Sequence, residues 1–422
     1  MNTLSTCKLL LTGLAVLAWP SLLFAQLPSE KLGLQQAIDY AFAHNPGWAA
    51  AQAAVRQTES RIDEAGGWAP PMVKFQQAIS PVQTKNGPQD QVLSFSQKIP
   101  FPGQNDLKVR QATYRYQVAL SQLELKRRGL IEEIKGSYFD LWLFEKLPDL
   151  LGQSQKVIER LADTRSIESQ QNQNLLSSIF DTQAAIGENA FELAQILDQL
   201  SDARARFDRL LGRTGGPVIR SVEPPEMISF SGDPEVLIAR TLKNHPKLLE
   251  LKAAEQAAEA ASRLAGDRAS QPDLQWGFNY IKIGAGTAGQ KDSGKDAYNL
   301  SLAMSLPWGN QTRGAKEKGA AAGLQVAASN RQAFEQEIRE KVTAHYNHVV
   351  NAERLVDLLE QTVLPPARQA DQINQRLYSG GRSQMSVSLR SKAQLINLEI
   401  KALKAKAGYL KSRAALEAWV GM

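Results

Sequence analysis

Two histidines three residues apart form the pair best spaced for metal binding. His345 and His348 lie in a stretch of helical composition, where such spacing places two imidazoles side by side for an ion such as Zn²⁺. A stable site needs more ligands, and the nearest carboxylate, Glu340, lies five residues before His345 on a poorly matching face. We expect a packed or pore-lining pair without metal. His44 and His245 stand beside prolines at expected helix breaks, which favours capping or packing roles.

Other residue types that carry chemistry lack partners in the sequence. The Gly-rich run at 284–289 lies between two expected strands, which indicates an exposed hairpin tip and not a phosphate-binding loop. Serine-rich stretches have no accompanying His and Asp. The single cysteine, Cys7, lies in a segment that we expect to be removed, which excludes disulfides and thiolate chemistry. We therefore predict no enzyme, no cofactor and no metal site.

The first 25 residues have the pattern of a secretory signal peptide. Lys8 precedes an apolar run from Leu9 to Leu17, and Ala25 supplies a small residue before the expected cut. Removal of residues 1–25 lowers the formal net charge from +6 to +5, a mild excess for a chain of 422 residues. Because no basic cluster is interleaved with aromatic residues, we expect no nucleic-acid partner. No later run reaches the roughly 18 apolar residues of a membrane-spanning helix.

The chain repeats itself at an offset of 200 to 209 residues. The matching motifs are His44-Asn45-Pro46 with Asn244-His245-Pro246, Leu93-Ser94-Phe95 with Leu300-Ser301-Leu302, Tyr138 with Tyr346, and Leu211-Gly212 with Val420-Gly421. Ordered matches with a slowly drifting offset indicate internal duplication. We divide the chain into a signal peptide (1–25), a first repeat (26–213), a Gly- and Pro-containing linker (214–232) and a second repeat (233–422).

Four stretches change to a two-residue period, which predicts β-strands with two different faces. We place them at about 72–80, 91–99, 273–283 and 297–306. Nine to eleven residues is about the length that a tilted strand needs to cross a bilayer. The expected lipid-facing side chains are Phe75, Phe95, Trp276, Phe278, Leu300 and Leu302, opposite small and amide residues that suit a wet lumen. Two soluble hairpins packed on helices are the alternative.

Long helices must position these strands. Residues from about 104 to 164 and from about 312 to 377 predict rods of ~90 Å at 1.5 Å per residue, with interruptions at Gly136, Pro148 and Pro365-Pro366. Each rod should turn back and return in a helix of roughly 36 residues, again judged at 1.5 Å per residue. Four strands cannot close a membrane barrel alone, since the smallest have about eight. Spanning strands would therefore require oligomerisation.

With this order of elements, the chain resembles the TolC family of outer-membrane efflux proteins, more closely its CusC/CzcC-like branch. The resemblance covers nearly all of the chain after the signal peptide. It is carried by Leu34-Gln35-Gln36-Ala37-Ile38 through Asn45-Pro46, by the strand exit from Leu93 to Ile99-Pro100-Phe101-Pro102-Gly103, and by Val363-Leu364-Pro365-Pro366-Ala367-Arg368 leading to Tyr378, Gly381 and Leu389.

The resemblance implies a mostly α fold with a small transmembrane β part. Three chains would form a homotrimer with a twelve-stranded β-barrel in outer-membrane lipid, continued by a periplasmic α-helical barrel. It further implies that the helix tips dock onto a periplasmic adaptor protein that is linked to an inner-membrane pump, of the RND type. The tip residues are Gln171, Asn172, Gln173, Gly380, Gly381, Arg382 and Ser383.

The periplasmic mouth departs from the family pattern. Well-known members carry rings of aspartates a few residues after the tip glycine, and the corresponding positions here are Val387 and Arg390. The first repeat places Asp181 opposite Arg390, at an offset of 209. Two readings are open: Asp181 and Arg390 form an inter-helix ion pair that holds the mouth closed, or both are solvated charges.

The expected function is passive conduction of metal cations, drugs or other small molecules across the outer membrane. A periplasmic coiled-coil adaptor or scaffold without a barrel is one alternative. An outer-membrane factor for type I protein secretion is another, and differs only in cargo. The expected location is the cell outer membrane, with the helical part in the periplasm.

Overall fold

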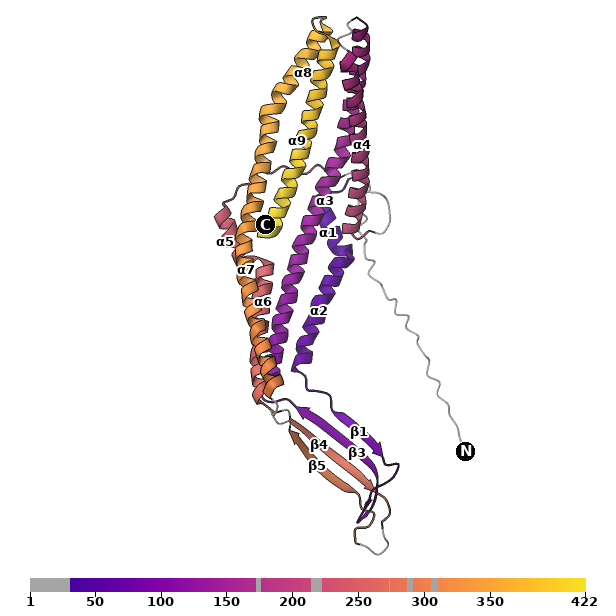
Figure 1. Cartoon of the computed structure of the whole chain (residues 1–422), viewed down its shortest axis with the longest axis vertical. Coiled ribbons are helices and arrows are strands. Elements are labelled where there is room, and N and C mark those ends of the chain that lie inside the picture. The colour runs from indigo at the N-terminus through magenta and orange to yellow at the C-terminus, as the bar shows by residue number, and fades with distance from the viewer. Residues whose placement is uncertain (1–30, 172–175, 214–221, 273, 287–290, 305–309) are drawn as a thin grey trace, which may run out of the picture.

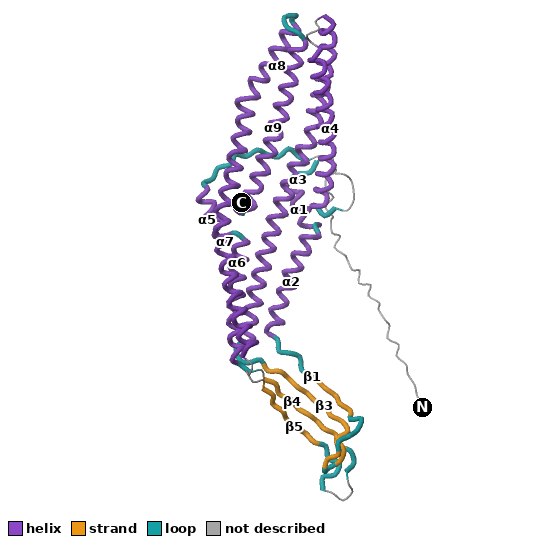
Figure 2. The backbone as a smooth tube through the Cα atoms, in the orientation of Figure 1, coloured by secondary structure: helices purple, strands orange, loops and turns teal. Residues whose placement is uncertain are grey.

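The computed structural model describes residues 31–171, 176–213, 222–272, 274–286, 291–304 and 310–422. They form an elongated molecule, with long helices along most of its length and a β-sheet at one end (Figures 1 and 2). The expected signal peptide and the tip residues Asn172 and Gln173 lie outside the described residues. Within the described ranges, no helix combines the length and the apolar composition that a membrane crossing requires.

The same order of elements occurs twice. The first set is α1 (Leu34–His44), α2 (Pro46–Gly66), β1 (Met72–Gln77), β2 (Gln83–Thr84), β3 (Gly87–Ile99), α3 (Gln104–Gln171) and α4 (Leu176–Leu210). The second set is α5 (Pro234–Asn244), α6 (Pro246–Ser270), β4 (Leu274–Ile283), β5 (Ala297–Met304), α7 (Asn310–Asp357), the π-helix η2 (Leu358–Val363), α8 (Leu364–Ser379) and α9 (Met385–Val420). The tandem arrangement of helix, hairpin, helix and helix is thus confirmed.

Each set opens with two helices that are separated by a one-residue break. The Asn45 side chain accepts a hydrogen bond from the Trp48 N–H at 3.0 Å, and Pro46 takes the first position of α2, where its missing N–H costs nothing. His245 has the same place before α6, since its Nδ1 accepts from the Lys247 N–H at 3.1 Å. The expected breaks and the capping role of His245 are confirmed.

Helix α3 is continuous over 68 residues, or about 100 Å at 1.5 Å per residue. The interruptions expected at Gly136 and Pro148 are therefore wrong. A proline removes one helical hydrogen bond, but Leu147 and Leu151 on either side of Pro148 are buried in the main core, and Asn189 of α4 donates to the Leu151 carbonyl. Tertiary packing outweighs the local preference.

The corresponding rod of the second set changes pitch near its two prolines. The π-helix η2 ends directly before α8, and the Leu364 N–H donates to the Leu359 carbonyl, five residues back. Pro365 and Pro366 follow within the first turn of α8, where a missing N–H is tolerated. The interruption expected at these prolines is thus a π-helical turn in an otherwise continuous rod, as is common where an α-helix holds one extra residue.

The sheet has the order β1-β3-β4-β5, with every neighbouring pair antiparallel, and the short β2 pairs with β3. β1 stops at Gln77, before the expected end at 80, because Pro81 lies just beyond and cannot donate to a strand ladder. β3 begins at Gly87, earlier than expected, and contains an irregularity between Gln89 and Gln91. The expected strand residues 305 and 306 lie outside the described part.

The main core lies at mid-length, where α1, α5 and the ends of α4 and α9 meet the middle of the long helices (Figure 1). Tyr138, Phe207 and Tyr409 are each 1% exposed there. Two glycines end the return helices in the left-handed region, Gly212 at φ 74° and Gly421 at φ 75°. They are the pair that the repeat aligned, and both allow the tight C-terminal turn that a side chain disfavours.

Candidate functional site

One face of the sheet is apolar and uncovered. Strand register places Phe95 opposite both Val73 and Phe278, and Phe278 opposite Leu300. The next rows pair Phe75 with Leu93 and Trp276 with Leu302. Paired residues share a face, so all six side chains expected to face lipid lie together: Phe75, Phe95, Trp276, Phe278, Leu300 and Leu302.

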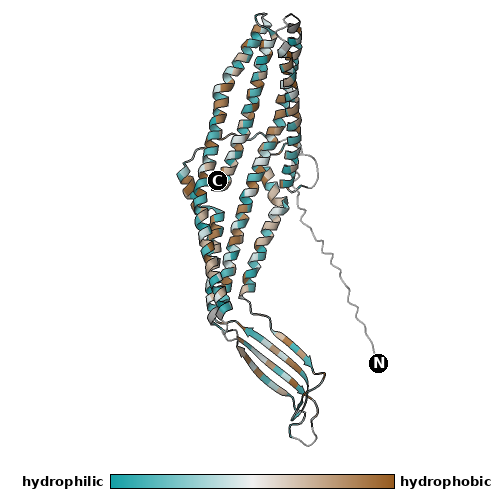
Figure 3. Cartoon of the chain, viewed as in Figure 1, coloured by the Kyte–Doolittle hydropathy of each residue, from teal (hydrophilic) through white to brown (hydrophobic). Residues whose placement is uncertain are grey.

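The exposure of this face is unusual for a single chain in water. Leu300 is 81% exposed, Leu302 75% and Phe75 62%, and Figure 3 shows the apolar bands crossing the strands. A contiguous apolar patch of this kind marks a surface that meets lipid or protein. The burial that a soluble hairpin would find against helices is absent from the described part of the chain.

The opposite face is polar and made of small side chains. Ser94 lies opposite Lys74 and Asn279, and Asn279 lies opposite Asn299. The Asn279 Nδ2 donates to the Asn299 Oδ1 at 2.6 Å. In the adjacent row Ser301 lies against Gly277, where a side chain would collide with the Ser301 hydroxyl. This face can line a water-filled space without unpaired buried groups.

The helix tips lie together at the end far from the sheet (Figure 1). At the end of α8, the Arg382 N–H donates to the Leu377 carbonyl at 2.8 Å and the Gly381 N–H to the Tyr378 carbonyl at 3.0 Å. This is the Schellman pattern, with Gly381 at φ 70°. Gly380 has φ −84°, so only one of the two glycines needs the left-handed region.

Two further tip residues, Gln171 and Ser383, lie at or beside helix ends. Gln171 is the last residue of α3, and Ser383 follows Arg382 in the short connection to α9. The two helices of the first tip are tied together by Arg165, whose Nη1 donates to the Ser178 carbonyl and the Thr182 hydroxyl at 2.8 Å each.

Asp181 on α4 and Arg390 on α9 are both exposed. Neither makes an ion pair within the described part of the chain, although the neighbouring Lys392 lies 3.7 Å from the buried Asp371. A pair between Asp181 and Arg390 is therefore not formed within one chain, and that reading would need a contact between chains.

The four histidines take packing roles. His345 and His348 stand edge to face with ring centroids 6.3 Å apart, and His345 lies 5.7 Å from Trp419. Burial, with smaller contributions from His348 and Lys341, lowers the pKa of His345. The His44 ring stacks on Tyr40 at 3.9 Å. No group of three or more His, Cys, Asp or Glu side chains suited to a metal occurs among the residues that the structure describes.

The surroundings of His245 shift its pKa strongly. Its ring lies 5.2 Å from both Phe334 and Trp419 and is 6% exposed. Burial, with a smaller contribution from Arg128, lowers the pKa of His245 to about 4. The imidazole is therefore neutral at neutral pH, as its role of accepting the helix-capping hydrogen bond requires.

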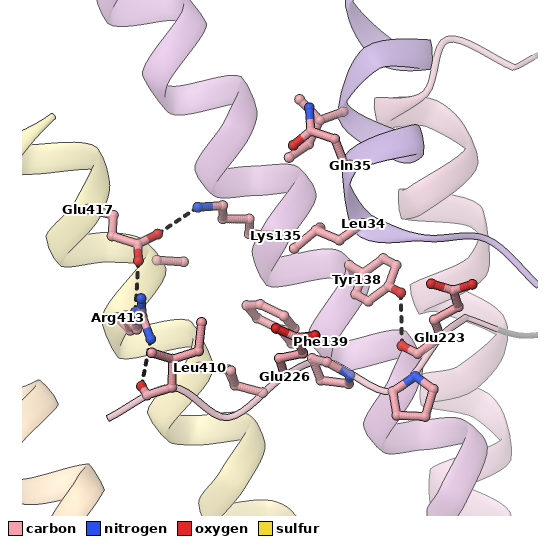
Figure 4. Close-up of a pocket in the computed structure, with 15 residues that line it drawn as sticks. Leu34, Gln35, Lys135, Tyr138, Phe139, Glu223, Glu226, Leu410, Arg413 and Glu417 are labelled. Carbon is pink, nitrogen blue, oxygen red and sulfur yellow. Dashed lines mark hydrogen bonds and ion pairs between the residues drawn. The ribbon is translucent and has the colours of Figure 1, made fainter. Parts of the chain in front are cut away.

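A cavity of about 560 Å³ lies at mid-length between α1, α3, α9 and the linker (Figure 4). Several of its polar groups pair with one another: the Lys135 Nζ is 2.6 Å from the Glu417 carboxylate, and Arg413 contacts both Glu417 and the Ile228 carbonyl. The Tyr138 hydroxyl bonds to the Glu223 carbonyl at 2.8 Å. The contacts of Arg413 with Ile228 and of Tyr138 with Glu223 fasten the linker to the helices.

Two linker anchors are equivalent in the two repeats and were not apparent from the sequence. The Glu145 carboxylate accepts the Val222 N–H at 3.2 Å, and the Glu353 carboxylate accepts the Phe230 N–H at 3.0 Å. Burial raises the pKa of Glu145, against the opposing effect of the Val222 N–H. The two glutamates are 208 residues apart, the offset of Tyr138 and Tyr346. The sequence aligns Glu145 with Glu353 at this offset, but it does not show that their carboxylates hold the linker.

The chain has the fold of known outer-membrane channels. The outer-membrane channel OprN has a TM-score of 0.72 to this chain at 16% identity, over 92% of this chain and 89% of OprN. VceC of Vibrio cholerae has a TM-score of 0.68 at 18% identity, over 92% of this chain and 96% of VceC. CmeC of Campylobacter jejuni has a TM-score of 0.72 at 13% identity, over 92% of this chain and 85% of CmeC. No protein-family model and no curated protein matches the sequence.

At these identities the likeness establishes the fold, which is TolC-like and mostly helical with a small sheet. The similar proteins are outer-membrane channels and not enzymes. Because one fold can support different activities, the function of this chain has to be argued from its own surfaces.

Proposed function

We propose that this chain is one third of a homotrimeric outer-membrane channel of the TolC family, which passively conducts solutes out of the cell. The observation that carries the proposal is the uncovered apolar face of the sheet, with Leu300 81% exposed and Leu302 75% exposed. Lipid would cover that face, and the polar face with Asn279 and Asn299 would line the lumen.

The sheet edges explain why more than one chain is needed. β1 and β5 each have one neighbour in the chain, so each leaves a row of backbone groups unpaired. Because the strands alternate in direction along β1-β3-β4-β5, β1 and β5 run antiparallel to each other. Copies can therefore join edge to edge in one continuous antiparallel sheet, and closure removes every edge. Three copies of four strands give the twelve-stranded barrel.

The helical part would continue the conduit through the periplasm. Its tips would meet a periplasmic adaptor that is coupled to an inner-membrane pump of the RND type, which supplies the energy. Transport through the chain itself then needs no covalent chemistry, in keeping with histidines that pack and carboxylates that hold backbone N–H groups. Metal cations, drugs and secreted proteins are all cargo classes for such a channel.

The competing function is a periplasmic scaffold or adaptor without a membrane barrel. Such a protein would be expected to bury the apolar side of its sheet, whereas here Phe75, Leu300 and Leu302 are exposed. A channel for type I protein secretion shares every surface described above and would differ in cargo.

Membrane fractionation and bilayer recording together test the proposal. We expect the mature chain in the outer-membrane fraction, as a trimer after detergent extraction, with discrete conductance steps in planar lipid bilayers. Recovery in the soluble periplasmic fraction without a detergent-stable trimer would contradict the proposal. Transport of a folded or unfolded protein substrate, and not of small solutes, would favour the secretion alternative.

A further inference from the structure

The polar face of the sheet carries positive charge alone. Lys74 on β1 and Lys98 on β3 both lie in its rows, Lys74 opposite Ser94 and Lys98 opposite Gln275. Both side chains are exposed, and neither makes an ion pair within the described part of the chain. The other members of these rows are uncharged: Met72, Gln76, Val92, Ser94, Ser96, Gln275, Gly277, Asn279, Ile281, Ala297, Asn299, Ser301 and Ala303.

Carboxylates are excluded from these rows. The one acidic residue within the described strands is Asp90, which lies in the irregularity between Gln89 and Gln91 at the far end of the sheet. In a barrel of three copies, Lys74 and Lys98 would supply six ammonium groups to the lumen wall with no opposite charge in the same rows. Rings of lysine or arginine are the usual means by which a pore favours anions.

The helix tips at the opposite end of the molecule carry charges of both signs. The α8–α9 tip bears Arg376, Arg382 and Arg390, all exposed and without an ion pair within the described residues. Its one carboxylate, Asp371, is buried and lies 3.7 Å from Lys392. The first tip carries Asp163, Glu168 and Asp181 against one basic residue, Arg165, and therefore opposes this charge. The uncompensated cationic charge of the conduit thus lies on the wall of the sheet, at Lys74 and Lys98.

We infer that this channel conducts anionic solutes in preference to cations, a selectivity that rests on the proposed function. Uncompensated lysines on the wall of a pore raise the local concentration of anions and repel cations. Their effect is larger than on an open surface because the surrounding wall focuses the field. Anionic organic molecules are therefore the cargo class that the wall suits, and metal cations are disfavoured.

The test is the reversal potential of the purified trimer in a planar bilayer under a KCl gradient. We expect the reversal potential to shift from zero towards the equilibrium potential of chloride. Such a shift corresponds to a chloride-to-potassium permeability ratio above unity. The double variant Lys74→Gln/Lys98→Gln should bring this ratio towards unity, and Lys74→Glu/Lys98→Glu should invert it. The matched control is Lys282→Gln, since Lys282 pairs with Gln91 on the other face of the same sheet; its ratio should stay that of the unmodified chain.

The arms of the experiment separate the two proposals. Absence of any conductance from the intact trimer would overturn the proposed channel function. A conducting channel that prefers potassium would overturn the anion inference and leave the channel function standing. The unmodified protein decides both points, so a variant that fails to assemble does not remove the test. If Lys282→Gln shifts the ratio as much as the double variant does, the assignment of the lumen face is wrong.

Discussion

At the scale of single residues, the two repeats cap equivalent helices with different side chains. Asn45 caps α2 and His245 caps α6, each directly before a proline. The amide of Asn45 does not titrate, whereas the imidazole of His245 can accept the capping hydrogen bond only when its Nδ1 is unprotonated. The N-terminal cap is thus pH-dependent at α6 and not at α2.

This difference predicts an acid-sensitive stability that Asn would remove. The pKa of His245 is about 4 in the folded chain against 6.5 for the free group. As pH falls through that interval the unfolded chain binds a proton that the folded chain does not, so stability is lost between about pH 6.5 and pH 4. The loss should be on the order of 2 kcal/mol by pH 4.5. His245→Asn should keep the cap and reduce the fall in melting temperature of the detergent-solubilised protein.

The control is the same scan on His348→Asn, a histidine that caps no helix. A slope for His245→Asn as steep as that of the unmodified chain would show that other groups govern the acid response.

Two glycines with the same backbone conformation differ in what surrounds them. Gly212 and Gly381 have φ of 74° and 70°. A Cβ on Gly381 would meet nothing within 4 Å, whereas one on Gly212 would overlap the backbone of His44 and Asn45. Gly381→Ala should therefore cost only the left-handed penalty, about 1–2 kcal/mol. Gly212→Ala should cost clearly more, because the end of α4 must also move away from α1.

Chemical unfolding of the two variants in parallel measures this difference. Equal losses would mean that the contact between Gly212 and the α1–α2 break does not constrain the end of α4.

At the scale of elements, the sequence pattern predicted the strands and their faces well and predicted the helix interruptions poorly. The alternation of Phe75, Phe95 and Leu300 with polar neighbours was sufficient to assign the two faces of the sheet, because side-chain direction in a strand follows directly from position. Pro148 shows the opposite case. Whether this proline breaks the helix depends on the core around Leu147 and Leu151, which a local pattern in the sequence does not contain.

The residues of the candidate site likewise divide into those that the sequence pattern predicts and those that depend on tertiary structure. Face assignment needs only period and composition, and it placed all six apolar residues correctly on one side. The anchors Glu145 and Glu353 depend on where the linker crosses the helices, so their hydrogen bonds to Val222 and Phe230 become visible only with tertiary structure. The pairing of Asp181 with Arg390 would depend on a further level, the arrangement of chains.

The face assignment predicts opposite outcomes for arginine at neighbouring positions of β5. Leu302→Arg places a charge on the apolar face beside Trp276 and should cost about 2–4 kcal/mol if the site lies near mid-bilayer. Ser301→Arg points into the proposed lumen beside Gly277, which offers space, and should leave assembly intact while altering conductance. The yield of detergent-stable trimer and the single-channel conductance report the two effects. Comparable trimer yields for both variants would contradict the assignment.

At the scale of the whole molecule, elongation follows from where the apolar surface is placed. The helices pack in a belt at mid-length and along α3, and the sheet packs against nothing within the described chain. Exposed apolar side chains also occur along the helices, such as Phe180 and Phe191 on α4 and Val326 on α7. In the proposed trimer this chain would be a wall segment, and identical neighbours and lipid would cover its exposed apolar surface.

Closure of the sheet by neighbouring copies predicts a specific covalent product. A cysteine at Lys74 in β1 would approach β5 of the next chain, where Ala297, Asn299, Ser301 and Ala303 share the same polar face. Cysteine at 74 combined in turn with cysteine at each of these positions should yield, on mild oxidation, covalent trimers for the one or two pairs in register. The single natural cysteine, Cys7, lies in the expected signal peptide, so the engineered thiols would be the reactive ones.

The product distribution on denaturing gels distinguishes closure from looser association. A closed ring links every chain to two others, so oxidation to completion should convert dimers to trimers and stop there. Products that extend beyond trimers would indicate an open, edge-to-edge array, and absence of any cross-link across the four positions would show that β1 and β5 do not meet. Because β1 and β5 run antiparallel, a pair that succeeds also fixes the register between chains, and with it the heights at which the Lys74 and Lys98 rings lie in the lumen.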